Sequence, residues 1–426
     1  MLERTSTFDV VVVGAGPGGL AAATAATAAG RSVALIDDAP LPGGQIWRHQ
    51  RSPGKAAKRF IDQLAGVTRF QQAKVIATPS EPTLLVETPD GPRYVGWRSL
   101  VLATGARELF LPFPGWTLPG VVGAGGIQAL IKQGLSVRGK RVVVAGTGAL
   151  LLVVADLLRS EGAIVPAILE QASAHRINRF ALSLLRTPRK LLAGAAFRAK
   201  LATSGTRYAT NSYPTAVSDT GSGLRVEYRS GAMTAAMDCD LLACGFNLIP
   251  NNELPQLLGC QLAADGFIRV DAQLRSTVPG IYAVGEVNGI GGADKAMIEG
   301  QIAAHTISGN TAGAAHPATA HAASLRFARN LAETFALRPE LKSLARPDTL
   351  VCRCEDVPLS AIAGSRSGRD AKLQTRCGMG PCQGRVCGPI LQHLFLTEPP
   401  AVRPPLFATA IGTLASNSKT APGHQQ

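Results

Sequence analysis

Short apolar runs that end in glycine recur three times in the first three quarters of the chain. They lie in FDVVVVGAGPGGLAAATAATAAGRSVALIDD (8–38), GKRVVVAGTGALLLVVADLLRSEGAIVPAILE (139–170) and RVDAQLRSTVPGIYAVGEVNGIGGADKAMIEGQIAAHTI (269–307). Uninterrupted Val, Leu and Ile runs are typical of strands buried on both faces of a parallel sheet. A segment of helical length follows each glycine turn. The pattern predicts an α/β protein built from dinucleotide-binding folds.

The first glycine turn carries a complete nucleotide-binding pattern. Gly14, Gly16 and Gly19 have G-x-G-x-x-G spacing, and Asp37 ends the next strand about 20 residues later. One glycine permits the tight turn, one lets the backbone approach a pyrophosphate, and one lets helix and strand pack closely. The helix N-terminus offers N–H groups to phosphate, and Asp37 can accept hydrogen bonds from a ribose. We expect a dinucleotide here.

The second turn is less complete. Gly146 and Gly148 match the first two glycines, but Leu151 takes the third position, and Glu170 stands where the ribose-binding acid belongs. An acid there favours a 2′-hydroxyl over a 2′-phosphate. The segment predicts a site for NAD(P) or another adenine nucleotide, with a packed relic of the fold that binds nothing as the alternative.

The third segment completes the first fold. The strand GIYAVGE ends in Gly285 and Glu286, and an acid at this place can hydrogen-bond the ribityl-phosphate region of a flavin dinucleotide. Two further short strands, in SLVLATGARE and DLLACGFNLIP, end at Thr104-Gly105 and Cys244-Gly245. We expect each of them to close one nucleotide-binding fold.

Composition and charge narrow the class of protein. The 426 residues are 46% hydrophobic and 17% charged, enough for two or three domains, and the net charge is +14. Lys and Arg are scattered without a nucleic-acid-binding motif, so we expect no nucleic-acid partner. The N-terminus predicts a strand rather than a secretory leader, and no apolar run reaches the roughly 20 residues of a membrane span. We expect a cytoplasmic protein, with peripheral membrane contact left open.

Cysteines gather in the last fifth of the chain. Cys352 and Cys354 form C-x-C, and Cys382 and Cys387 form C-x4-C on glycine-rich sequence. Two close thiolate pairs suit an iron–sulfur cluster or a zinc ion, and C-x-C is unusual for structural zinc. A [2Fe–2S] cluster is the preferred interpretation, with zinc or free thiols as alternatives. Cys377 is a fifth candidate, because it repeats the x4 spacing.

The order of these segments resembles the flavoproteins with two dinucleotide-binding domains, the glutathione-reductase and thioredoxin-reductase superfamily. The resemblance implies FAD on the first fold, with LPGGQIW (41–47) beside the isoalloxazine, where Gly44 allows close approach and Gln45 can hydrogen-bond the ring. Residues 42–60 lack the cysteine pair of disulfide reductases. The implied domains are FAD-binding, 1–118 with 246–330; inserted nucleotide-binding, 119–245; [2Fe–2S]-binding, 331–400; and a disordered tail, 401–426.

Two stretches carry a narrower resemblance. CRCE with TRCGMGPCQGRVC is similar to bacterioferritin-associated-ferredoxin-type [2Fe–2S] domains, which favours Cys382 and Cys387 as ligands and Cys377 as a packed thiol nearby. ATGARELFLPFPGWTLPGVVGAGGIQALIKQG (103–134) resembles the α subunits of heteromeric FAD-dependent amino-acid dehydrogenases. That family includes opine oxidases, D-hydroxyproline and L-proline dehydrogenases, and hydrogen cyanide synthase.

This resemblance implies a division of labour. A flavoprotein β subunit would oxidise the substrate C–N bond, and this chain would pass the electrons through the cluster and FAD to an acceptor. A small γ subunit is left open, as is an FMN shared with the partner. No residue is predicted as a catalytic base. The alternatives are a self-contained NAD(P)H dehydrogenase that feeds a ferredoxin-like acceptor, and a cofactor-bearing scaffold without catalysis.

Overall fold

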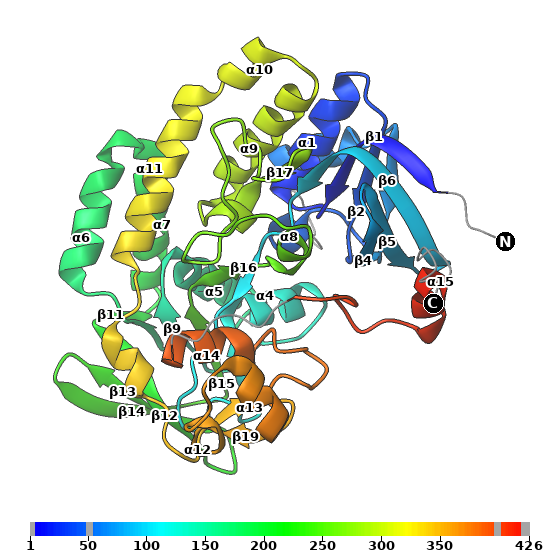
Figure 1. Cartoon of the computed structure of the whole chain (residues 1–426). Coiled ribbons are helices and arrows are strands. Elements are labelled where there is room, and N and C mark those ends of the chain that lie inside the picture. The colour runs from blue at the N-terminus through cyan, green and yellow to red at the C-terminus, as the bar shows by residue number, and fades with distance from the viewer. Residues whose placement is uncertain (1–4, 48–53, 396–401, 419–426) are drawn as a thin grey trace. The chain divides into compact units, whose positions relative to one another are not determined.

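The computed structural model describes residues 5–47, 54–395 and 402–418, and the chain divides into two compact units. Unit 1 comprises residues 1–107, 249–328 and 401–426, and unit 2 comprises residues 108–248 and 329–400. The chain passes between the units within strand β7 (Ala106–Glu108), strand β16 (Leu248–Pro250) and helix α11 (Ala318–Thr334). Figure 1 labels β16 and α11. The division does not separate the predicted domains at 119–245 and 331–400, so their boundaries stay a prediction.

Unit 1 holds the first and third glycine segments. Its strands are β1 (Ser6–Val13), β2 (Val33–Ile36), β3 (Val67–Phe70), β4 (Lys74–Ser80), β5 (Thr83–Thr88), β6 (Gly91–Leu102) and β17 (Ile281–Ala283). Its helices are α1 (Pro17–Ala28), α2 (Gly44–Trp47), α3 (Lys55–Asp62), α8 (Glu253–Leu257), η2 (Gly285–Asn288), α9 (Gly292–Ile307), α10 (Thr311–Ala315), most of α11, and α15 (Ile411–Ser418).

The unit 1 strands form one sheet in the order β3-β2-β1-β6-β5-β4, with β17 also paired to β6. β1 runs parallel to β2 and β6, and Val13 pairs with both Ile36 and Leu102. β4 and β5 extend the sheet as an antiparallel hairpin on β6. The apolar runs seen in the sequence therefore lie at the parallel centre of the sheet, and all three glycine-linked strand ends of unit 1 meet at one edge.

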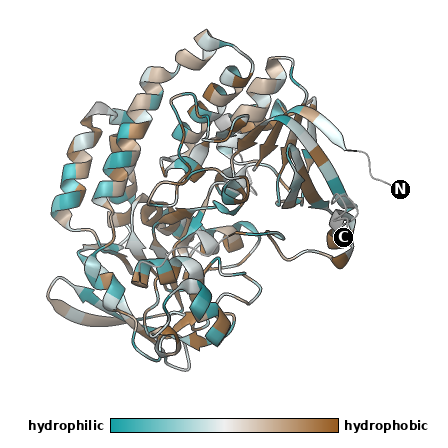
Figure 2. Cartoon of the chain, viewed as in Figure 1, coloured by the Kyte–Doolittle hydropathy of each residue, from teal (hydrophilic) through white to brown (hydrophobic). Residues whose placement is uncertain are grey.

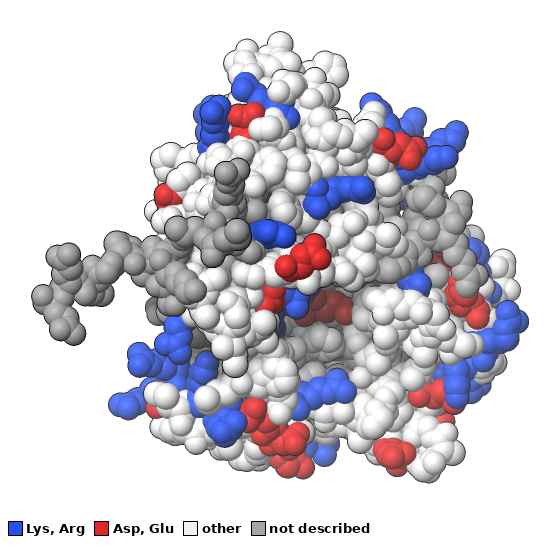
Figure 3. Space-filling view, turned by 90° about the vertical axis from the view of Figure 1, so that its right-hand side faces the viewer, with Lys and Arg blue, Asp and Glu red and all other residues white. Residues whose placement is uncertain are grey.

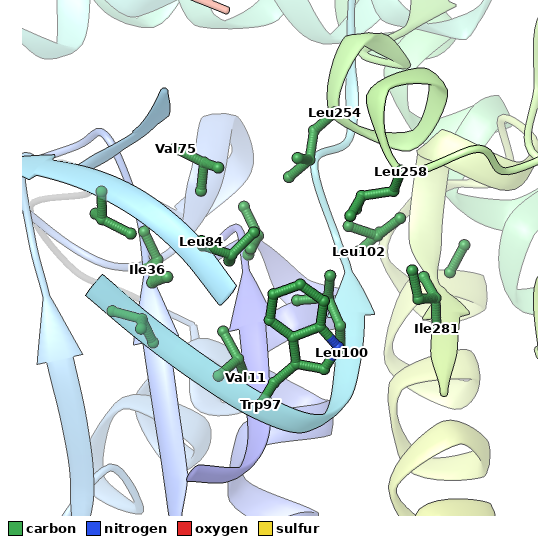
Figure 4. Close-up of a cluster of buried hydrophobic side chains, with 14 of the residues drawn as sticks. Val11, Ile36, Val75, Leu84, Trp97, Leu100, Leu102, Leu254, Leu258 and Ile281 are labelled. Atoms are coloured by element: carbon green, nitrogen blue, oxygen red, sulfur yellow. The ribbon is translucent and has the colours of Figure 1, made fainter. Parts of the chain in front are cut away.

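One face of this sheet packs a hydrophobic core. Figure 4 shows Val11, Leu100 and Trp97 from the strands approaching Leu254 and Leu258 from the α8 segment. These side chains are nearly inaccessible to solvent, and each contributes about 1.5–3 kcal/mol to stability by leaving water. The core fixes the strand ends that carry the glycine turns.

The other face carries α1 and α9 in close contact. The alanine-rich α1 is buried almost all round, and a Cβ on Gly300 of α9 would lie 2.8 Å from the backbone nitrogen of Ala22. A helix buried on every side has no polar face, which explains its lack of amphipathic pattern. The close packing of small residues holds the first glycine turn against the third segment.

Unit 2 holds the second glycine segment and the cysteine-rich segment. Its strands are β8 (Val121–Gly123), β9 (Val142–Thr147), β10 (Ala167–Glu170), β11 (Arg207–Thr210), β12 (Ser212–Asp219), β13 (Leu224–Ser230), β14 (Met233–Cys239), β15 (Leu241–Phe246), β18 (Leu350–Cys352) and β19 (Val357–Pro358). Its helices are α4 (Ala124–Lys132), α5 (Ala149–Ser160), α6 (Ala174–Ser183), η1 (Leu184–Arg186), α7 (Pro188–Ala202), η3 (Pro339–Ser343), α12 (Leu359–Ile362), α13 (Gly368–Thr375) and α14 (Cys387–Phe395).

A five-stranded parallel sheet, β11-β10-β9-β15-β8, forms the centre of unit 2, with β12-β13-β14 as a separate antiparallel sheet. The half-buried Glu108 carboxylate accepts hydrogen bonds from the N–H groups of Gly125 and Gly126 in the first turn of α4, at 2.7 and 3.0 Å. An acid at a helix N-terminus stabilises that end of the helix. The predicted fold class, α/β with two Rossmann-like domains, is confirmed.

The tail differs from the prediction of disorder after residue 400. Residues 402–418 are described, and Glu87 Oε1 accepts hydrogen bonds from Thr409, Ala410 and Thr413 where α15 begins. Leu406 is buried in the core of unit 1. The stretch is poor in aromatic residues, but the Glu87 carboxylate, the Tyr94 hydroxyl that donates to the Ser416 carbonyl, and the apolar contact of Leu406 hold it on unit 1. Residues 419–426 lie outside the described residues.

The distribution of hydropathy and charge follows the layers. Figure 2 shows hydrophobic residues along the central strands and mixed residues along α6 and α11. On the face shown in Figure 3, Lys and Arg lie in several separate groups, interspersed with Asp and Glu. Among the described residues, no helix has the length and apolar character to cross a membrane.

Candidate cofactor sites

The first glycine turn has the backbone geometry of a nucleotide cradle. Gly14 has φ +106°, and a Cβ there would collide with the Ala103 carbonyl, so only glycine fits. A Cβ on Gly19 would collide with the Gly14 carbonyl, which fixes the spacing of turn and helix. Gly16 instead faces open space, with no atom within 4 Å of a Cβ. Gly14, Gly16 and Gly19 thus leave room for a phosphate at the start of α1.

Asp37 holds this turn from the end of β2. Its two carboxylate oxygens accept hydrogen bonds from the N–H groups of Ala15 and Ala39, at 2.5 and 2.9 Å. The side chain remains half-exposed. It can therefore brace the turn and still meet a ribose.

The loop LPGGQIW lies directly against the turn. Gly43 donates its N–H to the Ala15 carbonyl at 2.8 Å, and a Cβ on Gly44 would lie 2.8 Å from Gly16 Cα. Gln45 is exposed at the start of α2. The close approach that the sequence assigned to Gly44 is made to protein backbone.

The Gly285–Glu286 turn rests on a buried ionic network that the sequence did not indicate. Lys295 and Glu299, one helical turn apart on α9, are 2% and 1% exposed and pair at 2.8 Å. Lys295 Nζ also donates to the Gly285 carbonyl, and the Gly285 N–H donates to Glu299, while His321 Nε2 lies 3.1 Å from Glu299 Oε1. Burial raises the pKa of Glu286, and the positive charge of Lys295 opposes that shift. The network fixes the backbone of this turn.

Thr104 and Gly105 are held by one asparagine. Thr104 Oγ1 donates to the Asn251 carbonyl at 2.7 Å, and Asn251 Nδ2 donates back to the Thr104 carbonyl at 2.9 Å. The Asn251 N–H reaches the Gly105 carbonyl at 3.0 Å. These bonds position the end of β6 beside the first glycine turn, since Ala103 donates to Val13 across β1 and β6.

The second glycine turn is built similarly, but the acid that braces it is buried, while Gly148 is half-buried. Gly146 has φ +134°, and a Cβ there would collide with the Gly245 carbonyl. Glu170 is fully buried: Oε1 accepts from Thr147 Oγ1 and the Ala172 N–H, and Oε2 accepts from the Gly148 N–H, each at 2.8 Å. Burial raises the pKa of Glu170 to about 7 against these hydrogen bonds. Its carboxylate serves the protein rather than a solvent-accessible site.

The five cysteines of the C-terminal segment converge. The sulfur atoms of Cys352, Cys377 and Cys387 lie within 4.8 Å of one another, and all three residues are at most 3% exposed. The Cys387 sulfur lies within hydrogen-bonding reach of Cys377 and Cys382, and this contact lowers the pKa of each of these two cysteines. Cys354 contacts Cys382 and is exposed.

Backbone N–H groups also hydrogen-bond to this cluster of sulfurs. The N–H groups of Gly384 and Val386 hydrogen-bond the Cys382 sulfur, as expected for a glycine-rich loop around thiolates. Cys352 ends β18 and Cys387 begins α14, so a strand and a helix fix two of the buried sulfurs. Cys377 lies as near to them as a ligand would, although the resemblance to ferredoxin-like domains favoured Cys382 and Cys387 as ligands instead. The donor set fits a thiolate-bound iron–sulfur cluster or zinc.

Comparison with protein families assigns most of the chain. Residues 8–322 match the model of the pyridine nucleotide-disulphide oxidoreductases. The chain belongs to this family. Membership implies an FAD-binding oxidoreductase, in agreement with the first glycine turn.

Relatives within the family are more specific. An opine oxidase subunit from Rhizobium meliloti strain 1021 is 32% identical over 96% of this chain and 99% of its own length. The HcnB subunit of hydrogen cyanide synthase from Pseudomonas aeruginosa PAO1 is 31% identical over 88% and 90%. These matches confirm the predicted resemblance to the α subunits of amino-acid dehydrogenases.

A solved structure extends the likeness in fold. L-proline dehydrogenase from P. horikoshii superposes with a TM-score of 0.66 at 18% identity, covering 96% of this chain and 80% of that one. At this identity the likeness concerns the fold alone. It spans the cysteine-rich segment as well as both nucleotide-binding folds.

Proposed function

We propose that this chain is the electron-transfer subunit of a heteromeric flavoprotein that oxidises an amino or imino acid, as in D-hydroxyproline dehydrogenase. The observation that carries the proposal is the convergence of five cysteines in a chain related to HcnB and to an opine oxidase subunit. A catalytic flavoprotein β subunit would oxidise the C–N bond. A small γ subunit, together with an FMN shared with the partner, belongs to the same proposal.

The proposal gives two cofactors to this chain. Gly14, Gly16, Gly19 and Asp37 would hold the adenosine and pyrophosphate of FAD, and Gly44, Gln45, Thr104, Gly105, Gly285 and Glu286 would line the rest of it. Open space at Gly16 supports this assignment. Cys352, Cys354, Cys382 and Cys387 would hold a [2Fe–2S] cluster, which supplies one-electron transfer when bound. Buried Cys352 and Cys387 would shield it, and exposed Cys354 would present it to a partner.

The test is co-expression of the chain with its partner subunit, followed by anaerobic purification. We expect flavin absorption, iron and inorganic sulfide in the complex, and substrate-dependent dye reduction. Cys354→Ser should lower the iron content and slow dye reduction at least tenfold. Cys260→Ser, a buried thiol of unit 1, is the matched control and should retain both.

The outcomes separate the alternatives. Turnover that is unchanged in Cys354→Ser despite loss of iron would support a scaffold role for this segment. Zinc in place of iron in the anaerobically purified complex would contradict the electron-transfer proposal. Unaltered iron and turnover in Cys354→Ser, with loss of both in Cys377→Ser, would move the fourth ligand to Cys377.

A further inference from the structure

The segment from Phe335 to Arg338, which follows α11, lies over the second glycine turn of unit 2. We propose that this segment closes the second nucleotide site, so that the chain takes no NAD(P) there and receives electrons only from protein partners. The inference does not depend on the iron–sulfur proposal, because it concerns a different part of unit 2.

The place of contact is the edge where this fold binds ligands. In open parallel sheets, ligands bind at the carboxyl ends of the strands, where the strand order reverses. In the order β11-β10-β9-β15-β8 the reversal falls between β9 and β15. Gly148 follows β9, Asn247 follows β15 and Gln171 follows β10. A nucleotide would have to occupy the space between these residues.

The segment makes hydrogen bonds to residues that follow two of these strands. Asn247 Nδ2 donates to the Phe335 carbonyl at 3.3 Å, and Gln171 Nε2 donates to the Ala336 carbonyl at 3.2 Å. The Arg338 N–H donates to Gln171 Oε1, also at 3.2 Å. The buried amide of Gln171 thus pairs with the segment on both of its polar atoms. A nucleotide would have to displace these bonds.

The ring of Phe335 lies beside the second glycine of the second turn, where the first fold has no side chain. Gly16 and Gly148 are the second glycines of the two turns. No atom lies within 4 Å of a Cβ on Gly16, whereas Phe335 Cγ lies 4.0 Å from a Cβ on Gly148. Phe335 is 6% exposed, and its ring packs edge-on against Phe180, with centroids 5.6 Å apart. An aromatic ring beside Gly148 offers a charged pyrophosphate no polar donor, which disfavours its binding there.

The acids at the ribose-binding position of the two folds also differ in their exposure to solvent. Asp37 is half-exposed, whereas Glu170 is fully buried and accepts hydrogen bonds on both oxygens from Thr147, Gly148 and Ala172. A ribose cannot reach a carboxylate enclosed by its own loop. The Gly148 N–H, which would face phosphate in a working turn, is also engaged by Glu170. The residues present therefore do not fit NAD(P).

The direct test uses the full wild-type chain carrying FAD. NADH and NADPH are added anaerobically at about 1 mM, the upper end of usual KM values, and flavin absorption is followed. ADP-ribose binding is measured in parallel by calorimetry. We expect no flavin bleaching and no saturable binding. Saturable binding, with protection of residues 146–170 from hydrogen exchange, would overturn the proposal.

A second experiment opens the site. Phe335→Ala should gain saturable ADP-ribose binding, at least tenfold tighter than the wild type, whereas Phe395→Ala, on α14, should gain none. A Phe335→Ala protein that keeps its flavin and circular dichroism but binds no ADP-ribose would contradict closure by the ring. If that variant does not fold, the wild-type titration decides.

Discussion

At the scale of single residues, equivalent positions of the two nucleotide folds have opposite environments. Asp37 and Glu170 both lie at the end of the second strand of a fold, and both accept hydrogen bonds from backbone N–H groups of a glycine turn. Asp37 is half-exposed and Glu170 is not exposed at all. Each acid lies a similar number of residues after the first glycine of its turn. The Glu170 carboxylate, however, is buried away from water, so folding changes its pKa.

Glu170 should therefore make stability depend on pH. Burial raises its pKa to about 7 from an ordinary 4.5, so the folded chain holds a proton between these values that the unfolded chain has lost. This stabilisation is complete below pH 4.5 and is lost as the pH rises to 7, by about 3 kcal/mol in all.

Urea unfolding at pH 5 and pH 8, roughly the two ends of this window, should show the loss of stability in the wild type. It should be much smaller in Glu170→Gln, whereas Asp238→Asn, at an exposed carboxylate, should keep the wild-type slope. An equal slope in Glu170→Gln would contradict the assignment.

The buried pair of Lys295 and Glu299 should be essential for unit 1. Lys295→Met removes one charge and leaves the Glu299 carboxylate buried without its cation, at a cost of about 3–5 kcal/mol. The matched control, Arg225→Met, breaks an exposed pair with Asp238 and should cost less than about 1 kcal/mol. Thermal unfolding and FAD retention measure both effects. A Lys295→Met protein as stable as the control would show that the pair does not support the Gly285 turn.

At the scale of elements, helices and strands are positioned by a few long-range polar contacts. Trp116 Nε1 donates to the Leu350 carbonyl at 2.6 Å, which ties β18 to the loop before β8 within unit 2. Glu87 at the end of β5 does the same for the segment that enters α15. These contacts join residues more than 200 positions apart, so they follow from tertiary structure alone.

Removing the Glu87 carboxylate should release α15. Glu87→Ala leaves the donors of Thr409, Ala410 and Thr413 without their acceptor, a loss comparable to a helix cap, about 0.5–2 kcal/mol. Hydrogen exchange of residues 409–418 should become faster, with unit 2 unchanged. Glu227→Ala, at an exposed strand position, is the control. Unchanged exchange in Glu87→Ala would mean that the other contacts, such as buried Leu406 and the hydrogen bond from Tyr94 to Ser416, hold the segment without the carboxylate.

At the scale of the whole molecule, the two proposed cofactor sites lie in different units. The first and third glycine segments lie in unit 1, whereas all five clustered cysteines lie in unit 2. Unit 1 contains Cys260, which is buried in the sheet core. Loss of one cofactor should therefore leave the other in place.

Chelation of iron under reducing conditions tests this independence. We expect the cysteine-rich segment to lose protection from proteolysis, because metal binding and folding of a small thiolate site are coupled. The flavin absorption of unit 1 should stay within about a tenth of its initial value, since its core and glycine turn contain no proposed cluster ligand. Parallel loss of flavin and iron would contradict separate sites. Adding zinc after chelation is the control, because it shows whether any bound metal restores protection of the cysteine-rich segment from proteolysis.

Local patterns in the chain were enough to predict the fold class, both glycine turns and the grouping of cysteines. These features depend on local causes: apolar runs of strand length, glycines at positions of positive φ such as Gly14 and Gly146, and thiolates at close spacing. The same patterns indicated the family, because they span almost the whole chain. Each glycine pattern is set by residues within about 30 positions of one another, the length of one βαβ unit.

Which of these local patterns is accessible could be learned only from the folded chain. Phe335 is far from Gly148 in sequence, and no periodicity places its ring over that turn. The pairing of Lys295 with Glu299 has helical spacing, but spacing does not show burial or the contact with His321. Cys377 joins Cys352 and Cys387 only when β18 and α14 are packed. Burial and long-range contact depend on the packed chain as a whole, and they govern whether a nucleotide, a metal or only the protein itself can occupy each motif.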